Sequence, residues 1–160
     1  MNFAKLLERY EQAPVSSERT FPANPFPRKY VHSVIDSLED AVKAVFALRV
    51  AGFDARHIHI MASWDFVEAV DRLHQHYNGL LKMLKRLYAF IDEGFAGVYL
   101  HEACQGHHIL IVHLLRRDQL EQVGDLLASH QAYLMKYVDT WTVTDLQPSR
   151  CENISSYRYA

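Results

Sequence analysis

The sequence lacks the features that mark several large classes of protein. It contains two cysteines in 160 residues, Cys104 and Cys151, which are too few for a disulfide scaffold and favour a reducing compartment. No apolar run approaches the roughly 20 residues that a membrane-spanning helix needs. The amphipathic N-terminus, MNFAKLLERYEQ, also differs from the basic and then apolar pattern of a signal peptide. We therefore predict a soluble cytoplasmic protein.

An excess of charge of one sign is lacking as well. The chain carries 17 Lys and Arg residues against 19 Asp and Glu residues, a formal net charge of -2. This balance gives no electrostatic basis for binding nucleic acid or an anionic membrane. Glycine-rich phosphate loops and the Gly-x-Ser-x-Gly elbow are absent from the sequence. The residues therefore indicate no catalytic set and no cofactor.

The residues that are present indicate one folded domain with two extensions. Hydrophobic residues make up 49% of the chain and charged residues 22%, the balance of a folded protein of single-domain size. We predict an N-terminal helix and proline-rich arm over 1–29, a single domain over 30–146 and a tail over 147–160. The arm contains Phe21 and Phe26, so we expect it either to lie against the domain or a partner subunit, or to form a partly ordered tether.

Two strand-helix-strand units follow one another within the predicted domain. The first runs from YVHSVID through a helix, with Ser37 as N-cap and Gly52 as terminator, to HIHIMAS. The second runs from HHILIVHLL through a helix to one last strand within YLMKYVDTWTVTDL. This order predicts an α+β split strand-helix-strand sandwich, with one antiparallel sheet and helices on one face. The right-handed crossover rule places the first and third strands in its centre.

A helical insertion separates the two units over about residues 65–105. Its apolar residues recur at steps of three and four, which predicts helices that bury one face. We expect them to cover the free face of the sheet or to contact a second subunit. Cys104 is expected on the core face of a short helix, next to Ala103.

The pattern resembles a known family. The segments DSLEDAVKAVFALRVAGF with HIHIM, and YLHEACQGHHILIVHL with DQLEQVGDLLASHQAYLMKYVDTWTV, resemble the heat-induced stress protein (YflT-like) and general stress protein domains over roughly residues 30–146. Gly106 and Trp141 match the family pattern, whereas the stretch from Ser129 to Ala132 lacks its turn glycine. The resemblance implies a ferredoxin-like domain with a stress-associated role, and it supplies no active-site residues.

The ten histidines are the most unusual feature of the composition. His101-Glu102 begins a zinc-protease pattern, but Gln105 stands where the second histidine would have to be. Strand alternation instead places His32, His59 and His113 on one face of three neighbouring strands. There they form a candidate site for a small ligand, either a metal ion or an anion. The alternative is that they line a subunit interface or form hydrogen bonds with the inserted helix.

The sequence thus favours a non-enzymatic, stress-associated or regulatory binding module that acts as a homo-oligomer. We expect neither nucleic acid nor a membrane as its partner. Two alternatives remain open: a small-ligand or metal sensor that uses the histidine-bearing sheet face, and a small dimeric α+β barrel enzyme. The histidine content also predicts that the net charge of -2 rises by several units between neutral and mildly acidic pH.

Overall fold

The computed structural model of the protein describes residues 25–76, 93–140 and 142–146. The predicted N-terminal helix, Phe21 and the tail lie outside these ranges. Within them, one antiparallel sheet has the strand order β2-β3-β1-β4-β5. Its strands are β1 (Tyr30–Ile35), β2 (Ile58–Met61), β3 (His108–His113), β4 (Tyr133–Val138) and β5 (Val143–Asp145). The fold is α+β, and β1 and β3 lie inside the sheet as predicted.

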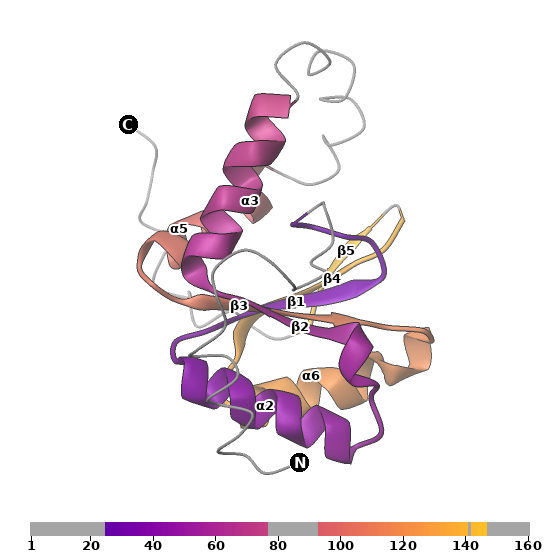
Figure 1. Ribbon diagram of the computed structural model, residues 1–160. Coiled ribbons are helices and arrows are strands. Elements are labelled where there is room, and N and C mark those ends of the chain that lie inside the picture. Colours follow the sequence, from indigo (N-terminus) through magenta and orange to yellow (C-terminus); the bar gives the residue numbers. More distant parts are fainter. Residues whose placement is uncertain (1–24, 77–92, 141, 147–160) are drawn as a thin grey trace.

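Helices lie on both faces of this sheet (Figure 1). They are α2 (Leu38–Val50), α3 (Ser63–His76), α5 (Glu93–Cys104) and α6 (Leu120–Ser129), with 3-10 turns η1 (Ala55–His57) and η2 (Arg117–Gln119). The crossover helices α2 and α6 cover one face, and α3 and α5, which come from the predicted insertion, cover part of the other. The insertion therefore packs on the free face of the sheet, the first of the two expected arrangements.

The prediction of one last strand is wrong, because the chain turns back and forms two. The Asp139 N–H donates to the Thr142 carbonyl at 2.8 Å, and this bond closes a hairpin between β4 and β5. The segment YLMKYVDTWTVTDL contains extended backbone, as predicted, in Tyr133–Val138 and Val143–Asp145, but its sequence pattern does not show where the chain reverses. As a result, β5 covers the outer edge of β4, and the sheet has five strands instead of four.

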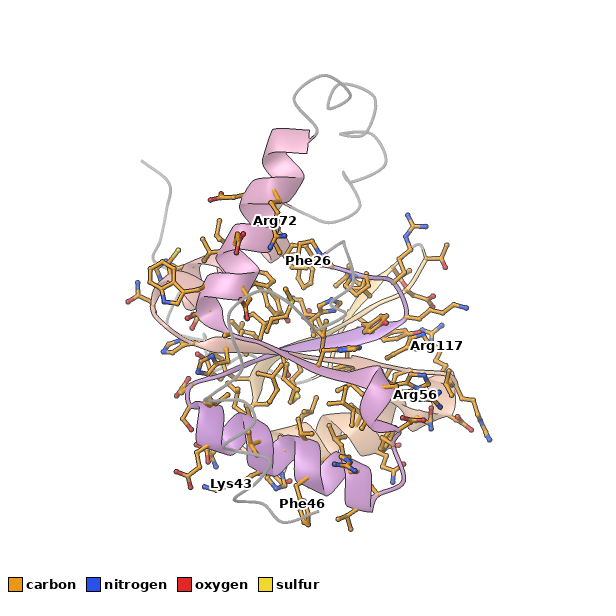
Figure 2. All side chains as sticks on the ribbon, in the orientation of Figure 1. Phe26, Lys43, Phe46, Arg56, Arg72 and Arg117 are labelled. Atoms are coloured by element: carbon orange, nitrogen blue, oxygen red, sulfur yellow. The ribbon has the colours of Figure 1, made fainter. Side chains whose placement is uncertain are left out.

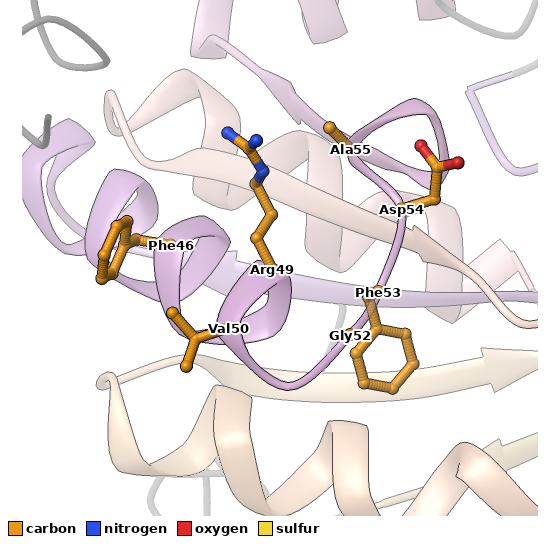
Figure 3. A pocket seen from close by; sticks show the side chains of 7 residues that line it. All are labelled: Phe46, Arg49, Val50, Gly52, Phe53, Asp54 and Ala55. Carbon is orange, nitrogen blue, oxygen red and sulfur yellow. The ribbon is translucent and has the colours of Figure 1, made fainter. Parts of the chain in front are cut away.

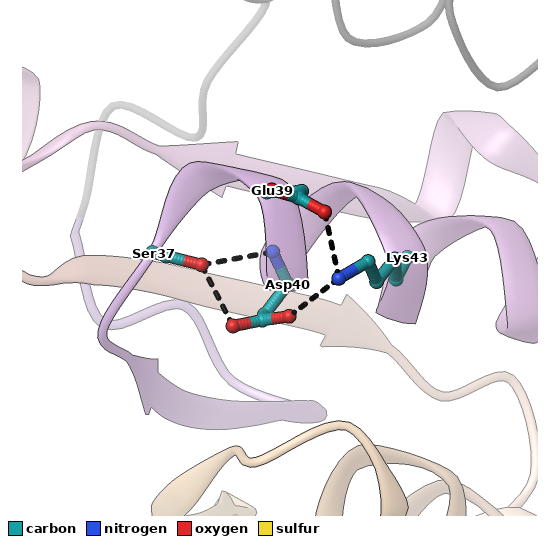
Figure 4. A network of polar contacts seen from close by, with 4 residues as sticks. All are labelled: Ser37, Glu39, Asp40 and Lys43. Atoms are coloured by element: carbon teal, nitrogen blue, oxygen red, sulfur yellow. Dashed lines mark hydrogen bonds and ion pairs between the residues drawn. The ribbon is translucent and has the colours of Figure 1, made fainter.

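Local sequence accounts for both ends of α2. The Ser37 hydroxyl accepts a hydrogen bond from the Asp40 N–H at 3.0 Å, as predicted for an N-cap. Lys43 pairs with Glu39 at 2.8 Å and with Asp40 at 3.0 Å on the next turn (Figure 4). At the other end Gly52 has a φ of +96°, a conformation that glycine adopts without strain. The turn directs the chain toward η1 and β2.

Two apolar cores lie on opposite faces of the sheet. The first joins α2 and α6 to Val31, Ile35, Ile58, Ile60, Leu110 and Val112. The second joins α3 and α5 to Val34, Met61, Ile109 and Ile111. Phe26, from the end of the predicted arm, is 3% exposed in the second core, where its ring lies 5.1 Å from that of Phe95 and 5.5 Å from that of Phe66 (Figure 2). This part of the arm therefore packs against the domain.

The end of α5 corrects the expectation for Cys104. Ala103 is buried against the sheet, whereas Cys104 is exposed. Tyr99 and Ala103 stand four residues apart and share the buried face, so the next residue along the helix points away from it. Gly106 then has a φ of +94°, and the His107 N–H donates to the Glu102 carbonyl at 3.1 Å. This turn brings His107 back beside the last turn of the helix.

Two glycines of similar exposure should respond oppositely to alanine. Gly97 lies within α5, where an added Cβ meets no atom within 4 Å, so Gly97→Ala should raise the free energy of unfolding by about 0.5–1 kcal/mol. Gly106→Ala should lower it by about 1 kcal/mol, because alanine is strained at positive φ. Urea unfolding followed by circular dichroism measures both. Equal effects of the two substitutions would contradict the turn geometry.

Candidate functional sites

Strand alternation places the three predicted site histidines on one face, as expected. His32 is opposite Ile111 on β3, and His59 is opposite the same residue from the other side. His113 is opposite Tyr30, two residues further along β3. Ile111 therefore separates His32 from His59, and the three imidazoles do not converge on one point.

His32 belongs to the core that α5 covers. Its side chain is fully buried, with ring centroids of Phe26, Phe95 and Tyr99 at 5.9, 6.0 and 6.3 Å. Neither ring nitrogen has a hydrogen-bond partner of good geometry, although backbone groups of Tyr30 and Lys136 lie near enough to favour the protonated form. Desolvation outweighs them and lowers the pKa of His32 to about 3. His32 is thus a neutral aromatic core residue.

His59 and His113 lie on the part of the face that the helices leave accessible. Both are partly exposed, as are Tyr30 and His57. The His113 ring stacks on Tyr30 with centroids 4.6 Å apart, and it meets the edge of the His57 ring at 5.1 Å. Burial lowers the pKa of His59 and His113, and the charge of His57 lowers both further. We call Tyr30, His57, His59 and His113 the imidazole patch.

This arrangement does not fit a metal ion in the described part of the chain. Among those residues, no group of three or more His, Cys, Asp or Glu side chains is close enough to hold one. The rings of Tyr30, His57 and His113 contact one another directly, whereas metal-bound imidazoles surround the ion and receive support from carboxylates.

A second polar cluster depends on a bulge in β4. Between the pairs His32–Lys136 and Val34–Tyr133 the register shifts by one residue, and Leu134 has a φ of +49°. The extra residue turns Tyr133 toward the face that carries α5, where Leu134 also packs. The Tyr99 hydroxyl donates to the Leu134 carbonyl and lies 3.1 Å from the His32 carbonyl oxygen. The helix therefore supplies the polar partner that the irregular strand requires.

Tyr133 meets Glu102 and His107 at this point. Its hydroxyl donates to Glu102 Oε2 at 2.7 Å, the same oxygen lies 2.7 Å from His107 Nδ1, and the Tyr133 oxygen lies 3.0 Å from that nitrogen. Because a carboxylate only accepts hydrogen bonds, the Nδ1 carries a proton. Burial raises the pKa of Tyr133, and its contacts with Glu102 and Asp36 raise it further, so the phenol stays protonated. We call Glu102, His107 and Tyr133 the α5–β4 network.

The sequence predicted none of these three residues as a site. Glu102 and His107 were visible as part of a histidine-rich stretch, in which Glu102 lies on α5 and His107 follows the turn at Gly106. Tyr133 could not be found in this way, because its orientation follows from the bulge, and regular alternation would place it on the opposite face.

A shallow hollow of different character lies at the end of α2. It is lined by Phe46, Arg49, Val50, Gly52, Phe53, Asp54 and Ala55 (Figure 3). None of the predicted site histidines takes part in it. Phe46 is 42% exposed and Val50 74% exposed, so the hollow is an open, partly apolar surface between a helix end and a loop.

Comparison of the chain with protein-family models, with curated proteins and with solved structures finds no match. The resemblance to stress-protein domains therefore stays a prediction from the sequence. No helix in the described ranges is both long and apolar enough to cross a bilayer.

Burial of His32 should make the free energy of unfolding decrease as the pH falls. The unfolded chain binds a proton near the ordinary pKa of 6.5, whereas the folded state resists protonation until about 3. The contribution of neutral His32 to the free energy of unfolding is therefore complete above about pH 6.5. It is lost as the pH falls below that value, by at most about 1.4 kcal/mol per pH unit. Urea unfolding from about pH 7 to 4.5 should show a shallower slope for His32→Leu than for wild type. The exposed His101→Gln should leave the slope unchanged; equal slopes for all three proteins would contradict the burial of His32.

Removal of the Tyr133 hydroxyl should destabilise the fold. Tyr133→Phe leaves the buried Glu102 oxygen without one donor and should lower the free energy of unfolding by about 1–3 kcal/mol. Tyr137→Phe is the matched control, because Tyr137 is 4% exposed on the same strand and its hydroxyl makes no hydrogen bond within the described residues. Chemical denaturation compares them, and a control as destabilised as Tyr133→Phe would show that the network contributes nothing specific.

Proposed function

We propose that the protein is a non-enzymatic regulatory binding module with a ferredoxin-like core and a stress-associated, cytoplasmic role, acting as a homo-oligomer. The core assignment is supported by the two strand-helix-strand units, whose strands take the order β2-β3-β1-β4. The stress role comes from the sequence resemblance alone. Oligomerisation is supported by exposed apolar side chains, Phe46, Val50, Trp64 and Leu115, which are 42–78% exposed.

The proposal of a binding function rests on one observation: the helices cover only part of the sheet face that carries the histidines. Helices α3 and α5, with Phe26, bury one part of that face, and the partly exposed rings of the imidazole patch occupy another. Core residues are typically apolar and fully buried, whereas these four side chains are polar and partly exposed. Such a surface is suited to recognition of a ligand.

The α5–β4 network resembles a catalytic set in composition, and its contacts favour a structural role. The Glu102 oxygen accepts from both Tyr133 and His107. The group lies at the junction of the last turn of α5 with β4, where it links the insertion to the sheet. Its residues are thus engaged with one another, which favours binding over catalysis for the protein as a whole.

The proposal predicts that the protein binds a ligand and leaves it chemically unchanged. We expect a panel of anionic, neutral and cationic metabolites to contain one class that raises the melting temperature of the full chain by about 5–10 °C at 100 times its dissociation constant. Mass spectrometry should then recover that ligand unchanged after prolonged incubation. Chemical conversion of the ligand would show an enzyme, and the absence of stabilisation by every class would overturn the binding proposal.

Quaternary structure is tested separately. Sedimentation velocity of the full chain should give a mass of at least twice 18.6 kDa, and Trp64→Glu or Val50→Glu should shift it toward the monomer if those side chains lie in the interface. A monomer throughout the micromolar range would overturn the oligomer proposal and would leave the binding proposal to the ligand panel.

A further inference from the structure

The imidazole patch follows a regular ladder across three strands. Because Ile58 is opposite Val112, His57 stands beside His113, and His113 is opposite Tyr30 on β1. The ring centroids are 5.1 and 4.6 Å apart, which places three polar rings in a row. His59 follows two residues further along β2 on the same face. Four side chains with N–H or O–H groups thus share a small area.

His57, His59 and His113 belong to neither apolar core, whereas Tyr30 packs against the second core. Met61 and Ile109 are opposite each other at the far end of the β2–β3 pair, where the second core begins. The patch belongs to the end where β2 starts and β3 finishes. The Tyr30 side of the ladder also adjoins Lys29, whose positive charge acts on His113 and lowers its pKa.

Four acidic groups on the elements around the patch have basic partners. Asp54, which caps η1 next to His57, pairs with Arg56 at 2.6 Å. Asp139 lies 3.7 Å from Arg117, Asp145 pairs with Lys136, and Glu68 on α3 pairs with Arg72 at 3.3 Å. Arg56 and Arg117 are labelled in Figure 2, beside the turns η1 and η2. The other acidic residues of α3 are Asp65 and Asp71.

Within the described ranges, no salt bridge joins His57, His59, His113 or Lys29 to a carboxylate. The Asp54 carboxylate interacts electrostatically with His57, but protonation of the three histidines creates cations that form no ion pair with a carboxylate of the described residues. Burial is the main cause of the lowered pKa values of His59 and His113, and repulsion by His57 lowers them further. An external anion would remove this repulsion and accept hydrogen bonds from the ring N–H groups, the Tyr30 hydroxyl and the Lys29 ammonium.

We propose that the imidazole patch is a binding site for a small tetrahedral oxyanion of the sulfate or phosphate class, which binds together with protons. The inference rests on the proposed binding function and gives that function a site and a ligand class. A tetrahedral oxyanion offers several acceptor oxygens to a row of donors that a single carboxylate would not satisfy. By linkage, a ligand that favours the protonated histidines binds more tightly as the pH falls.

Sulfate is the probe, because its charge is constant from pH 7.5 to 5.5 and any pH dependence then belongs to the protein. Titration of the full chain at constant ionic strength should show the sulfate dissociation constant falling at least about tenfold over this range, as expected for uptake of one or more protons. The ring signals of His57, His59 and His113, followed by NMR, should shift together and titrate at higher pH with sulfate than with chloride.

His113→Gln should weaken sulfate binding at pH 5.5 at least about tenfold and abolish most of its pH dependence. The matched control is His101→Gln, which removes an exposed histidine of α5 outside the patch and should bind as wild type does. His57→Gln is the second variant, to be used if His113→Gln fails to fold, because His57 precedes the strand and contributes to neither core.

Three results would overturn the proposal: equal shifts with chloride, which would indicate screening alone; sulfate binding unaffected by either patch variant; and no ring shift with sulfate. If a non-anionic member of the metabolite panel bound instead, the binding function would stand and the oxyanion site would fall. If no compound bound at all, both would fall.

Discussion

The contact between α5 and the bulged part of β4 organises the insertion side of the molecule. A bulge leaves backbone groups without their regular ladder partners and places a non-glycine residue, Leu134, at positive φ, which costs about 1–3 kcal/mol. Tyr99 supplies a hydroxyl to the carbonyl of Leu134, and Glu102, one turn later, binds Tyr133. The same face of α5 therefore donates a hydrogen bond to the irregular backbone of β4 and accepts one from Tyr133, the side chain that the bulge has turned.

This contact divides the histidines into groups with different chemistry. His32 lies beneath α5 and is neutral because its charged form cannot be solvated. His107 lies in the turn that follows the same helix and is held by a carboxylate. His59 and His113 lie beyond the helix and remain partly exposed. A high histidine content thus reflects several separate roles in this chain, and the accessible group is the one suited to respond to pH and to a ligand.

Features that depend on a few neighbouring residues were predictable. Ser37 and Gly52 bound α2 because capping and positive φ are local properties of the backbone. The face of each strand on which His32, His59 and His113 lie follows from the twofold period of extended chain. The last strand shows the limit of this reasoning, since alternation continues through the hairpin that begins at Asp139. Cys104 shows a second limit, because an apolar neighbour does not fix the face of a short helix.

The sequence by itself determined the two strand-helix-strand units, the central position of the first and third strands, and the side of the sheet that carries the histidines. Only the tertiary structure decided which histidine is buried, which are accessible, and that Tyr133 meets Glu102. Tyr133 and Glu102 are 31 residues apart, and Tyr99 and His32 are 67 apart. Periodicity and capping act over one or two turns of chain, whereas burial and hydrogen bonding between such distant residues depend on how the layers pack.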